Sequence, residues 1–387
     1  MSSINELITK LCPDGVEFWQ LGSAIKLNFG TRITKLEDSG TIYPVYGGGG
    51  ESFRTDQFNR EGEYVVSRFA MSEKCVRLVK GKFWMLDSGF TFDPVDDSID
   101  KNFVAYLLLN MQPAIYACSS QGAQKNLKTD QFRKFRIPIP PLEIQQEIVR
   151  ILDTFTELEA ELEAELEARK RQYAYYRDSL LNFPEAGGVR RIPMGELGEF
   201  IRGNGIQKTN LRESGVGVIH YGQIHTYYGT AATEVLSFID EDLAGRSRKA
   251  LPGDLVIATT SEDDEAVGKA VAWIGEEQIA VSGDAFIFRH TLAPKYVSYF
   301  FQTDEFQSHK KRYITGTKVR RISGDSLAKI EIPLPPREEQ DRIVDILDKF
   351  DALVNDLSTG LPAELNARRK QYEHYRDRLL TFEEALV

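Results

Sequence analysis

Cysteines and long apolar runs are scarce in this 387-residue chain, and each scarcity excludes a class of protein. The three cysteines, Cys12, Cys75 and Cys118, are an odd number, lie far apart and form no CxxC motif. They predict neither a disulfide framework nor a cysteine-based zinc site, and they fit a reducing, cytoplasmic environment. Because no run of about 18 apolar residues is present, we expect no transmembrane helix. The first residues, MSSINELITKLCPDG, lack the basic start and apolar stretch of a secretory signal.

Local motifs of common enzymes are also missing. The sequence holds no GxSxG, no HExxH, no Walker A motif and no dinucleotide-binding GxGxxG. This absence favours a chain that performs no chemistry by itself, although many active sites have no local motif. An enzyme that acts alone stays open as an alternative.

Three polar features look like ligand sites but have simpler interpretations. Gly47–Gly50 is not followed by the GK[ST] of a phosphate-binding loop, so a hairpin turn is the better prediction. His220 and His225 are five residues apart and lack nearby carboxylates, which favours packing or polar readout over a metal site. The acidic run Glu262–Glu265 could bind a cation, but a solvated loop is the default.

An internal duplication dominates the sequence. Residues 137–155 and 332–350 are identical at 12 of 19 positions with an offset of 195, and residues 165–183 and 364–382 at 12 of 19 with an offset of 199. The second copy is therefore four residues longer in its middle, about one helical turn. The chain divides into a variable domain, a helix, a second variable domain and a second helix, with the boundaries 1–136, 137–186, 187–331 and 332–387.

The repeated segments have the pattern of long helices. Each opens with Pro-x-Pro-Pro and an early glutamate, Glu143 or Glu338, which suit a helix start. Apolar residues then follow in steps of three and four over about 40 residues, which predicts one helix of about 60 Å with a narrow buried seam. We expect Gly360 and Pro362 to kink or bulge the second helix. The predicted seam residues are Ile144, Ile148, Leu152, Phe155, Leu158, Leu162 and Leu166 in the first helix and Ile343, Leu347, Phe350, Leu357 and Leu365 in the second.

Neither helix can bury its apolar seam alone. The simplest solution is that the two copies pack as an antiparallel coiled coil with the variable domains at opposite ends; the alternative is that each helix docks on its own domain. Within the first helix, the tetrad Glu-Leu-Glu-Ala occurs three times between Glu157 and Ala168. It is either a solvated helix face or a spacer in which each tetrad adds about 6 Å between the two domains.

The net charge of −10 argues against a nucleic-acid partner only as long as it is treated as one number. The helical segments 137–186 and 332–387 carry −6 and −4, whereas the variable domains 1–136 and 187–331 carry +1 and −1. The acidic excess therefore belongs to the helices, and the domains are almost neutral.

Each variable domain also ends in a basic loop just before its long helix. Both loops follow a glycine, Gly122 or Gly316, and lie at equivalent places of the duplication. Two such loops predict two contacts with one polyanion, with ordinary surface charge as the alternative. The candidate phosphate-binding residues are Lys125, Lys128, Arg133 and Lys134 in the first loop and Lys310, Lys311, Arg312, Lys318, Arg320 and Arg321 in the second.

This layout resembles the DNA specificity subunit of type I restriction–modification systems over nearly the whole chain. The resemblance rests on IPIPPLEIQQEIVRILD and IPLPPREEQDRIVDILD, on the loops GAQKNL and GTKVRRI before them, and on YPVYGGGG, VIHYGQIHTYYG and GDAFIFRH in the variable domains. It implies an α+β fold with two mixed α/β target-recognition domains, separated by an antiparallel helix pair and related by a pseudo-twofold duplication. The break at Gly360 departs from a family pattern of two matched helices.

The resemblance also implies a function. Each recognition domain would read one half of a split double-stranded DNA site, and the helix pair would set the gap. The helices would dock two methyltransferase subunits, which restriction and translocase subunits would join; S-adenosylmethionine, ATP and magnesium would be bound by those partners and not by this chain. A scaffold that holds two identical partners without touching DNA is the alternative. Arg, Lys, Asn and Gln side chains distinguish base edges, so the base-reading candidates are Arg32, Gln124, Asn126, Gln223 and His225.

Overall fold

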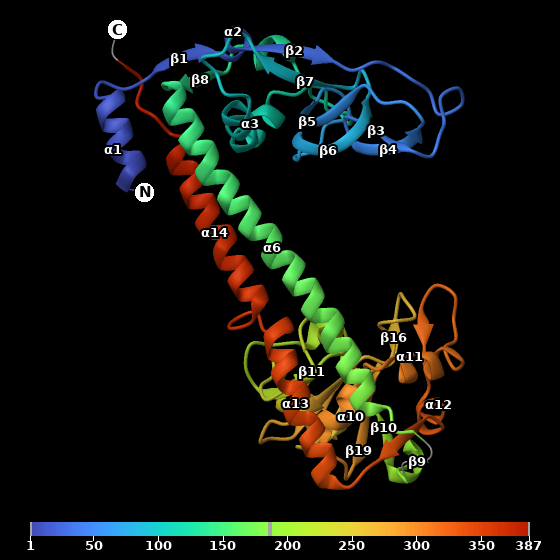
Figure 1. Cartoon of the computed structure of the whole chain (residues 1–387). Coiled ribbons are helices and arrows are strands. Elements are labelled where there is room, and N and C mark those ends of the chain that lie inside the picture. Colours follow the sequence, from blue (N-terminus) through green and yellow to red (C-terminus); the bar gives the residue numbers. More distant parts are fainter. Residues whose placement is uncertain (1, 185–187, 386–387) are drawn as a thin grey trace. The chain divides into compact units, whose positions relative to one another are not determined.

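The computed structural model describes residues 2–184 and 188–385 (Figure 1). It divides into two compact units: unit 1 comprises Met1–Glu161 and Asn366–Val387, and unit 2 comprises Leu162–Leu365. Each unit has hydrophobic clusters of its own. Among the described residues, no helix is both long and apolar enough to span a membrane.

Unit 1 is built on a six-stranded mixed sheet with the strand order β2-β7-β5-β6-β3-β4. Helix α3 (Lys101–Asn110) is buried on all sides from Phe103 to Leu108 and packs in the same hydrophobic cluster as the strand residues Phe90 and Phe92. The turn between β3 and β4 is formed by Gly48 and Gly49, which confirms the predicted hairpin. The strands are β1 (Glu17–Gln20), β2 (Ile25–Phe29), β3 (Tyr43–Gly47), β4 (Gly50–Thr55), β5 (Arg60–Ser67), β6 (Val76–Met85), β7 (Gly89–Pro94) and β8 (Arg136–Ile139). The remaining helices before residue 140 are α1 (Ser2–Leu11), α2 (Leu21–Ala24), α4 (Gln112–Ala117) and α5 (Thr129–Phe132).

Unit 2 contains a five-stranded sheet, β10-β19-β15-β17-β12, and a four-stranded sheet, β13-β11-β18-β14. The central strands β15 and β17 are buried along their whole length, which explains why LVIA and AVAW are continuous apolar runs without alternation. The strands are β9 (Arg190–Pro193), β10 (Gly198–Arg202), β11 (Val216–Ile219), β12 (Ala231–Ala232), β13 (Ser237–Ile239), β14 (Lys249–Ala250), β15 (Leu255–Ala258), β16 (Thr260–Ser261), β17 (Ala270–Trp273), β18 (Ile279–Val281), β19 (Ala285–His290), β20 (Arg320–Arg321) and β21 (Glu331–Leu334). The short helices are α7 (Met194–Leu197), η2 (Lys208–Asn210), α8 (Tyr221–Thr226), α9 (Glu241–Gly245), α10 (Pro294–Phe300), α11 (Asp304–Lys311) and α12 (Gly324–Ala328).

The duplication in the sequence is also a duplication of structure. In unit 1, β1 pairs antiparallel with β8, the strand that leads into the first long helix; in unit 2, β9 pairs in the same way with β21. After the first strand of each pair comes a glycine that has no room for a side chain. A Cβ on Gly22 would lie 2.9 Å from the Cβ of Arg133, and one on Gly195 would lie 2.9 Å from that of Ala328. Arg133 and Ala328 are themselves separated by the repeat offset of 195.

The first repeated segment forms one uninterrupted helix, α6 (Leu142–Leu181), of 40 residues, as predicted. Its first turns dock on unit 1, because Ile144, Ile148 and Leu152 are fully buried in the core of that unit. The interpretation in which each helix docks on its own domain is therefore correct for this part of α6.

The second repeated segment is two helices, α13 (Arg337–Asn355) and α14 (Leu361–Leu379), separated by a break at the predicted place. The carboxylate of Asp356 accepts hydrogen bonds from the Ser358 and Thr359 hydroxyls and also from their backbone N–H groups, which lowers its pKa and holds the turn. A Cβ on Gly360 would lie only 2.5 Å from the Ala352 carbonyl oxygen, so a side chain would not fit there. The expectation that Leu357 lies in the buried seam is wrong, because the break places it on the surface with 80% of its area exposed.

Within unit 1, α6 and α14 pack antiparallel. Phe155 stacks on Tyr375 with ring centroids 5.4 Å apart, and one turn later Glu159 forms an ion pair of 2.6 Å with Arg369. Increasing residue numbers on α6 therefore meet decreasing numbers on α14. Leu158, predicted in the seam, remains 42% exposed.

Within unit 2, α6 packs antiparallel on α13. The Tyr173 hydroxyl lies 3.4 Å from the Asp351 carboxylate, and Tyr176 stacks on Phe350 with ring centroids 5.2 Å apart. The seam residues Leu166, Ile343, Leu347 and Leu365 are all buried in the main core of this unit, and Leu162 is packed against it. The predicted antiparallel packing is thus confirmed inside each unit.

Candidate nucleic-acid interface

The basic loop of unit 1 is anchored on the end of strand β5. The Leu127 backbone N–H donates to the carbonyl of Arg68, directly after β5, at 2.8 Å. Next to it, the Met71 N–H donates to the Lys125 carbonyl at 3.0 Å, and the Asn126 side chain accepts a longer contact from the Ala70 N–H at 3.4 Å. These bonds hold residues 125–127 beside the end of β5, while residues 121–124 stay in solvent.

The side chain of Arg68 supports the same region. Its guanidinium lies over the rings of Phe69 and Phe29, at 4.6 Å and 5.1 Å from the ring centroids. Cation–π attraction to the two rings holds this guanidinium in place. The sequence alone gave no signal for this residue.

The basic loop of unit 2 is anchored at the equivalent point. The Ile322 N–H donates to the carbonyl of Thr259, directly after strand β15, at 3.1 Å. Ile322 follows Leu127 by the repeat offset of 195, so the two loops dock in the same way. A pair of backbone hydrogen bonds of 2.9 Å between Thr315 and Arg321 closes the loop, and Gly316 occupies the left-handed region with φ of 90°.

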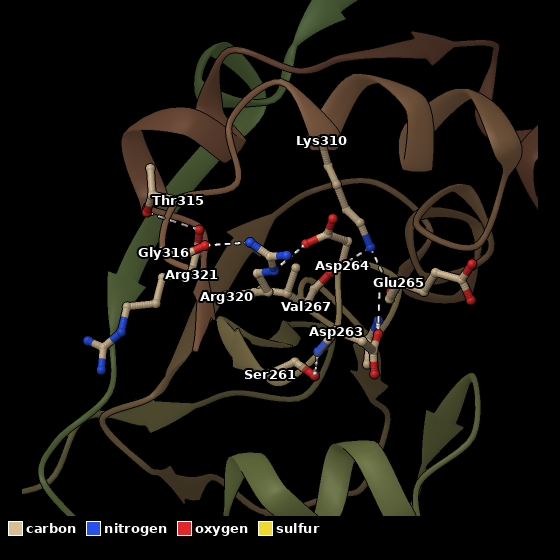
Figure 2. Close-up of polar contacts among 11 residues, drawn as sticks. Ser261, Asp263, Asp264, Glu265, Val267, Lys310, Thr315, Gly316, Arg320 and Arg321 are labelled. Atoms are coloured by element: carbon tan, nitrogen blue, oxygen red, sulfur yellow. Dashed lines mark hydrogen bonds and ion pairs between the residues drawn. The ribbon is translucent and has the colours of Figure 1, made fainter. Parts of the chain in front are cut away.

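The exposed cations of the two loops form the charged part of the candidate interface. In the second loop, Arg320 and Arg321 alternate on the short strand β20, which pairs with β16. Successive residues of a strand point to opposite sides, so the two guanidinium groups face different surroundings. Figure 2 shows Arg320 directed toward Asp264 and Arg321 directed away from it. The exposed cations are Lys128, Arg133 and Lys134 in unit 1 and Lys311, Arg312, Lys318 and Arg321 in unit 2; Lys125 is half-buried.

Comparison with known families identifies the fold and its role. Residues 13–168 and 188–367 each match the type I restriction modification DNA specificity domain. The chain belongs to this family. It is a specificity subunit, which supplies DNA sequence specificity in restriction–modification and is not the catalytic component.

Relatives of known sequence or structure agree with this assignment. This chain is 36% identical over 294 residues to the EcoR124I/EcoR124II specificity subunit of Escherichia coli. The match covers 72% of this chain and 70% of the relative. Its fold is similar to that of the type I restriction–modification S subunit of M. genitalium, with a TM-score of 0.57, 18% identity and coverage of 95% and 96%. A structure described as showing complex assembly and conformational transition of a type I restriction–modification system matches with a TM-score of 0.60, 17% identity and coverage of 95% and 98%.

One predicted phosphate contact of the specificity subunit is wrong. The side chain of Lys310 is fully buried, and its Nζ donates to the carbonyl oxygens of Glu265 and Val267 at 2.7 and 2.6 Å. Burial lowers the pKa of Lys310 to about 8, although Asp263 and Glu265 act in the opposite direction. Lys310 therefore holds a loop of the protein and does not face a ligand.

Two base-reading candidates are engaged inside unit 2. The Gln223 side chain accepts from the His220 N–H at 3.0 Å and donates to the Ser237 hydroxyl at 2.8 Å, which fixes the start of α8. His225 Nε2 lies 2.9 Å from the Thr260 carbonyl oxygen. Both side chains are half-buried and tie α8 to β13 and β16, so a change of rotamer would be needed before either could read a base.

The unit 1 candidates are more accessible. Arg32 lies in the irregular segment after β2, and Gln124 lies at the tip of the basic loop; both are exposed. Asn126 is half-buried, with its amide oxygen used by the Ala70 N–H. The structure thus leaves Arg32 and Gln124 exposed in unit 1, and makes Gln223 and His225 supporting residues in unit 2.

Proposed function

We propose that this specificity subunit recognises a bipartite target in double-stranded DNA, with each unit reading one part. The observation that carries the proposal is the matched anchoring of two basic loops, through Leu127 on Arg68 in unit 1 and Ile322 on Thr259 in unit 2. Equivalent loops on duplicated frames present equivalent surfaces, and two linked half-site contacts bind far more tightly than either alone because the second is intramolecular.

The chemistry of the loops supports two kinds of contact. Exposed Lys128, Lys318 and Arg321 are suited to phosphates, which position the protein but carry no sequence information. Exposed Arg32 and Gln124 are suited to base edges in the major groove, where Arg pairs with guanine and Gln with adenine. The near-neutral net charge of 1–136 and 187–331 is compatible with such contacts, because the acidic excess lies on the helices.

We further propose that the helices set the gap and carry the partner subunits. A similar fold is found in the structure described as showing complex assembly and conformational transition of a type I restriction–modification system. In that case the fold belongs to a larger assembly. By this reasoning the chain assembles with two methyltransferase subunits and, through them, with restriction subunits, and those partners bind S-adenosylmethionine, ATP and magnesium. The acidic face of α6, rich in glutamate from Glu157 to Glu167, would face solvent or these partners and stay away from DNA.

The test is the salt dependence of DNA binding by the chain assembled with its modification subunits. We expect affinity to fall steeply from low to moderate salt, since each phosphate contact releases counterions. Lys318→Glu should weaken binding and flatten the slope, whereas Lys349→Glu, an equal charge change on the exposed face of α13, should leave the slope unchanged. Binding that is absent, or that responds equally to both reversals, would favour a scaffold that does not touch DNA.

A further inference from the structure

The acidic run Glu262–Glu265 is not a free solvated loop, because one of its carboxylates holds a cation of the basic loop. Arg320 Nε and Asp264 Oδ1 form an ion pair of 2.8 Å without hydrogen-bond geometry; these two atoms are shielded from solvent, while the side chains as a whole are 33% and 46% exposed. The same guanidinium donates through Nη1 to the Gly316 carbonyl oxygen at 2.6 Å. Arg320 is therefore occupied on two sides by protein groups (Figure 2).

Asp264 is held in place by the rest of its loop. Asp263 accepts from the Glu265 and Ala266 N–H groups at 2.9 and 2.6 Å, which closes a tight turn around Asp264. From the other side, the buried ammonium of Lys310 ties the Glu265 carbonyl to α11. The carboxylate consequently meets Arg320 from a fixed position, and Figure 2 shows this order of contacts from Lys310 through the acidic turn to Arg320.

The neighbouring arginine has no such partner. Arg321 is exposed, and within residues 2–184 and 188–385 its guanidinium makes no hydrogen bond or ion pair. Its backbone, in contrast, is fixed by the bonds to Thr315. In unit 1 the residue equivalent to Arg320 is Lys125, for which the described residues likewise provide no ion pair.

We propose that Asp264 is a specificity-determining residue, which acts as an internal substitute for a DNA phosphate and keeps Arg320 out of contact with the backbone. The inference rests on the proposed DNA-binding function. Phosphate contacts add affinity for every sequence alike, so withholding one cation lowers non-specific binding. Because Arg320 is held by protein groups, the adjacent Arg321 extends from a rigid strand. DNA binding by the second loop then depends more on the correct placement of Arg321 than on the total charge of the loop.

The test measures binding of the assembled full-length chain to a DNA duplex of random sequence across a salt series. Asp264→Asn frees Arg320, so the slope of log affinity against log salt should steepen by about 0.9. At about 0.15 M salt, one added contact of this kind corresponds to an increase in non-specific affinity of about fivefold. The matched control is Glu262→Gln, which removes the same charge from an exposed carboxylate of the same run and should leave the slope unchanged.

Arg320→Gln completes the cycle and also covers the case in which Asp264→Asn fails to fold. It should leave the wild-type slope unchanged, and the double variant should return to that slope. An equal effect of Asp264→Asn and Glu262→Gln would show a general field effect and overturn the inference. A flatter slope for Arg320→Gln would also overturn it, since Arg320 would then already contact phosphate.

Failure of the inference is distinguishable from failure of the proposed function. If the wild-type assembly shows no salt-dependent DNA affinity, the proposed function fails. If it binds DNA but the effects of Asp264→Asn and Arg320→Gln on the salt slope simply add in the double variant, only the proposed role of Asp264 fails. A second measurement separates positioning from folding. The affinity for a duplex that carries the sequence modified by the assembled complex, divided by the affinity for the random duplex, should fall in Asp264→Asn. The thermal unfolding midpoint of this variant should stay near that of the wild type.

Discussion

The side-chain carbonyl of Gln145 on α6 accepts a hydrogen bond from the backbone N–H of Asp100 at 2.8 Å, and Asp100 is the residue that caps the buried helix α3. The amide nitrogen of Gln145 donates to the carbonyls of Ser98 and Pro140. In unit 2, Gln340 binds the N–H of Ala293, the capping residue of α10, in the same manner at 2.9 Å. A fully buried glutamine thus joins each long helix to the domain before it.

Gln145→Leu should destabilise unit 1 by about 2 kcal/mol, because it leaves the half-buried Asp100 N–H without a partner. The matched control is Gln146→Leu, at the next position on α6, where the side chain is exposed. Denaturant unfolding followed by circular dichroism would measure both. Equal stability of the two variants would show that this hydrogen bond does not hold the helix to its domain.

Stability of unit 2 should decrease as the pH falls from about 6.5 toward 4, because of His290. This side chain lies against Phe288, and both of its ring nitrogens are shielded from solvent. Burial lowers the pKa of His290 to about 4, with Asp254 opposing the shift. In this pH range the unfolded chain binds a proton that the folded chain does not, so stability is lost with a slope of up to about 1.4 kcal/mol per pH unit.

His290→Phe keeps an aromatic ring against Phe288 but cannot titrate. The variant should show a flatter dependence of its unfolding midpoint on pH between 4 and about 6.5, the ordinary pKa of histidine. Thermal unfolding at a series of pH values would measure this difference. If both proteins lose stability in parallel, His290 is not the group that titrates.

Lys310 and Lys311 are neighbours in sequence with opposite expected roles. Lys310→Met removes two buried hydrogen bonds, to Glu265 and Val267, and should cost about 2 kcal/mol of stability without flattening the salt dependence of DNA binding. Lys311→Met alters an exposed side chain and should flatten the slope by about 0.9 with little change in stability. The reverse pattern would restore Lys310 as a phosphate contact.

The Glu-Leu-Glu-Ala repeats of α6 should act as a spacer. Deleting Glu161–Ala164 removes about 6 Å of helix, which compares with about 3.4 Å per base pair and should shorten the gap between half-sites by one or two base pairs. Substituting Glu157 and Glu161 by Gln keeps the length and should keep the gap. The modified motif of cells carrying each variant gives the result, and an unchanged gap after the deletion would refute the spacer role.

The sequence predicted the features that depend on local pattern or on repetition. The spacing of the apolar residues and the position of the prolines predicted α6, and the longer second repeat indicated the break at Gly360. Gln145 and Gln340 were also detectable, because both glutamines are retained at matching positions of the duplication. A buried polar residue within an apolar seam was the signal.

What the sequence did not reveal depends on contacts between distant segments. Lys310 sits among other cations, and only its burial under a loop 45 residues earlier removes it from the surface. Gln223 has the chemistry of a base-reading residue but caps its own helix. The acidic run around Asp264 resembles a solvated loop until its partner Arg320 is known.

The most direct test of the account is sequencing of modified bases in the genome of cells that carry this chain together with its modification subunits. Two units with equivalent loops, anchored through Leu127 and Ile322, predict one motif with two specified parts separated by an unspecified gap. Gln124→Ala, at an exposed base-reading candidate of unit 1, should relax the sequence of one part and leave the other part unchanged. A continuous motif, or relaxation of both parts by this single substitution, would contradict the claim that each unit reads its own half-site.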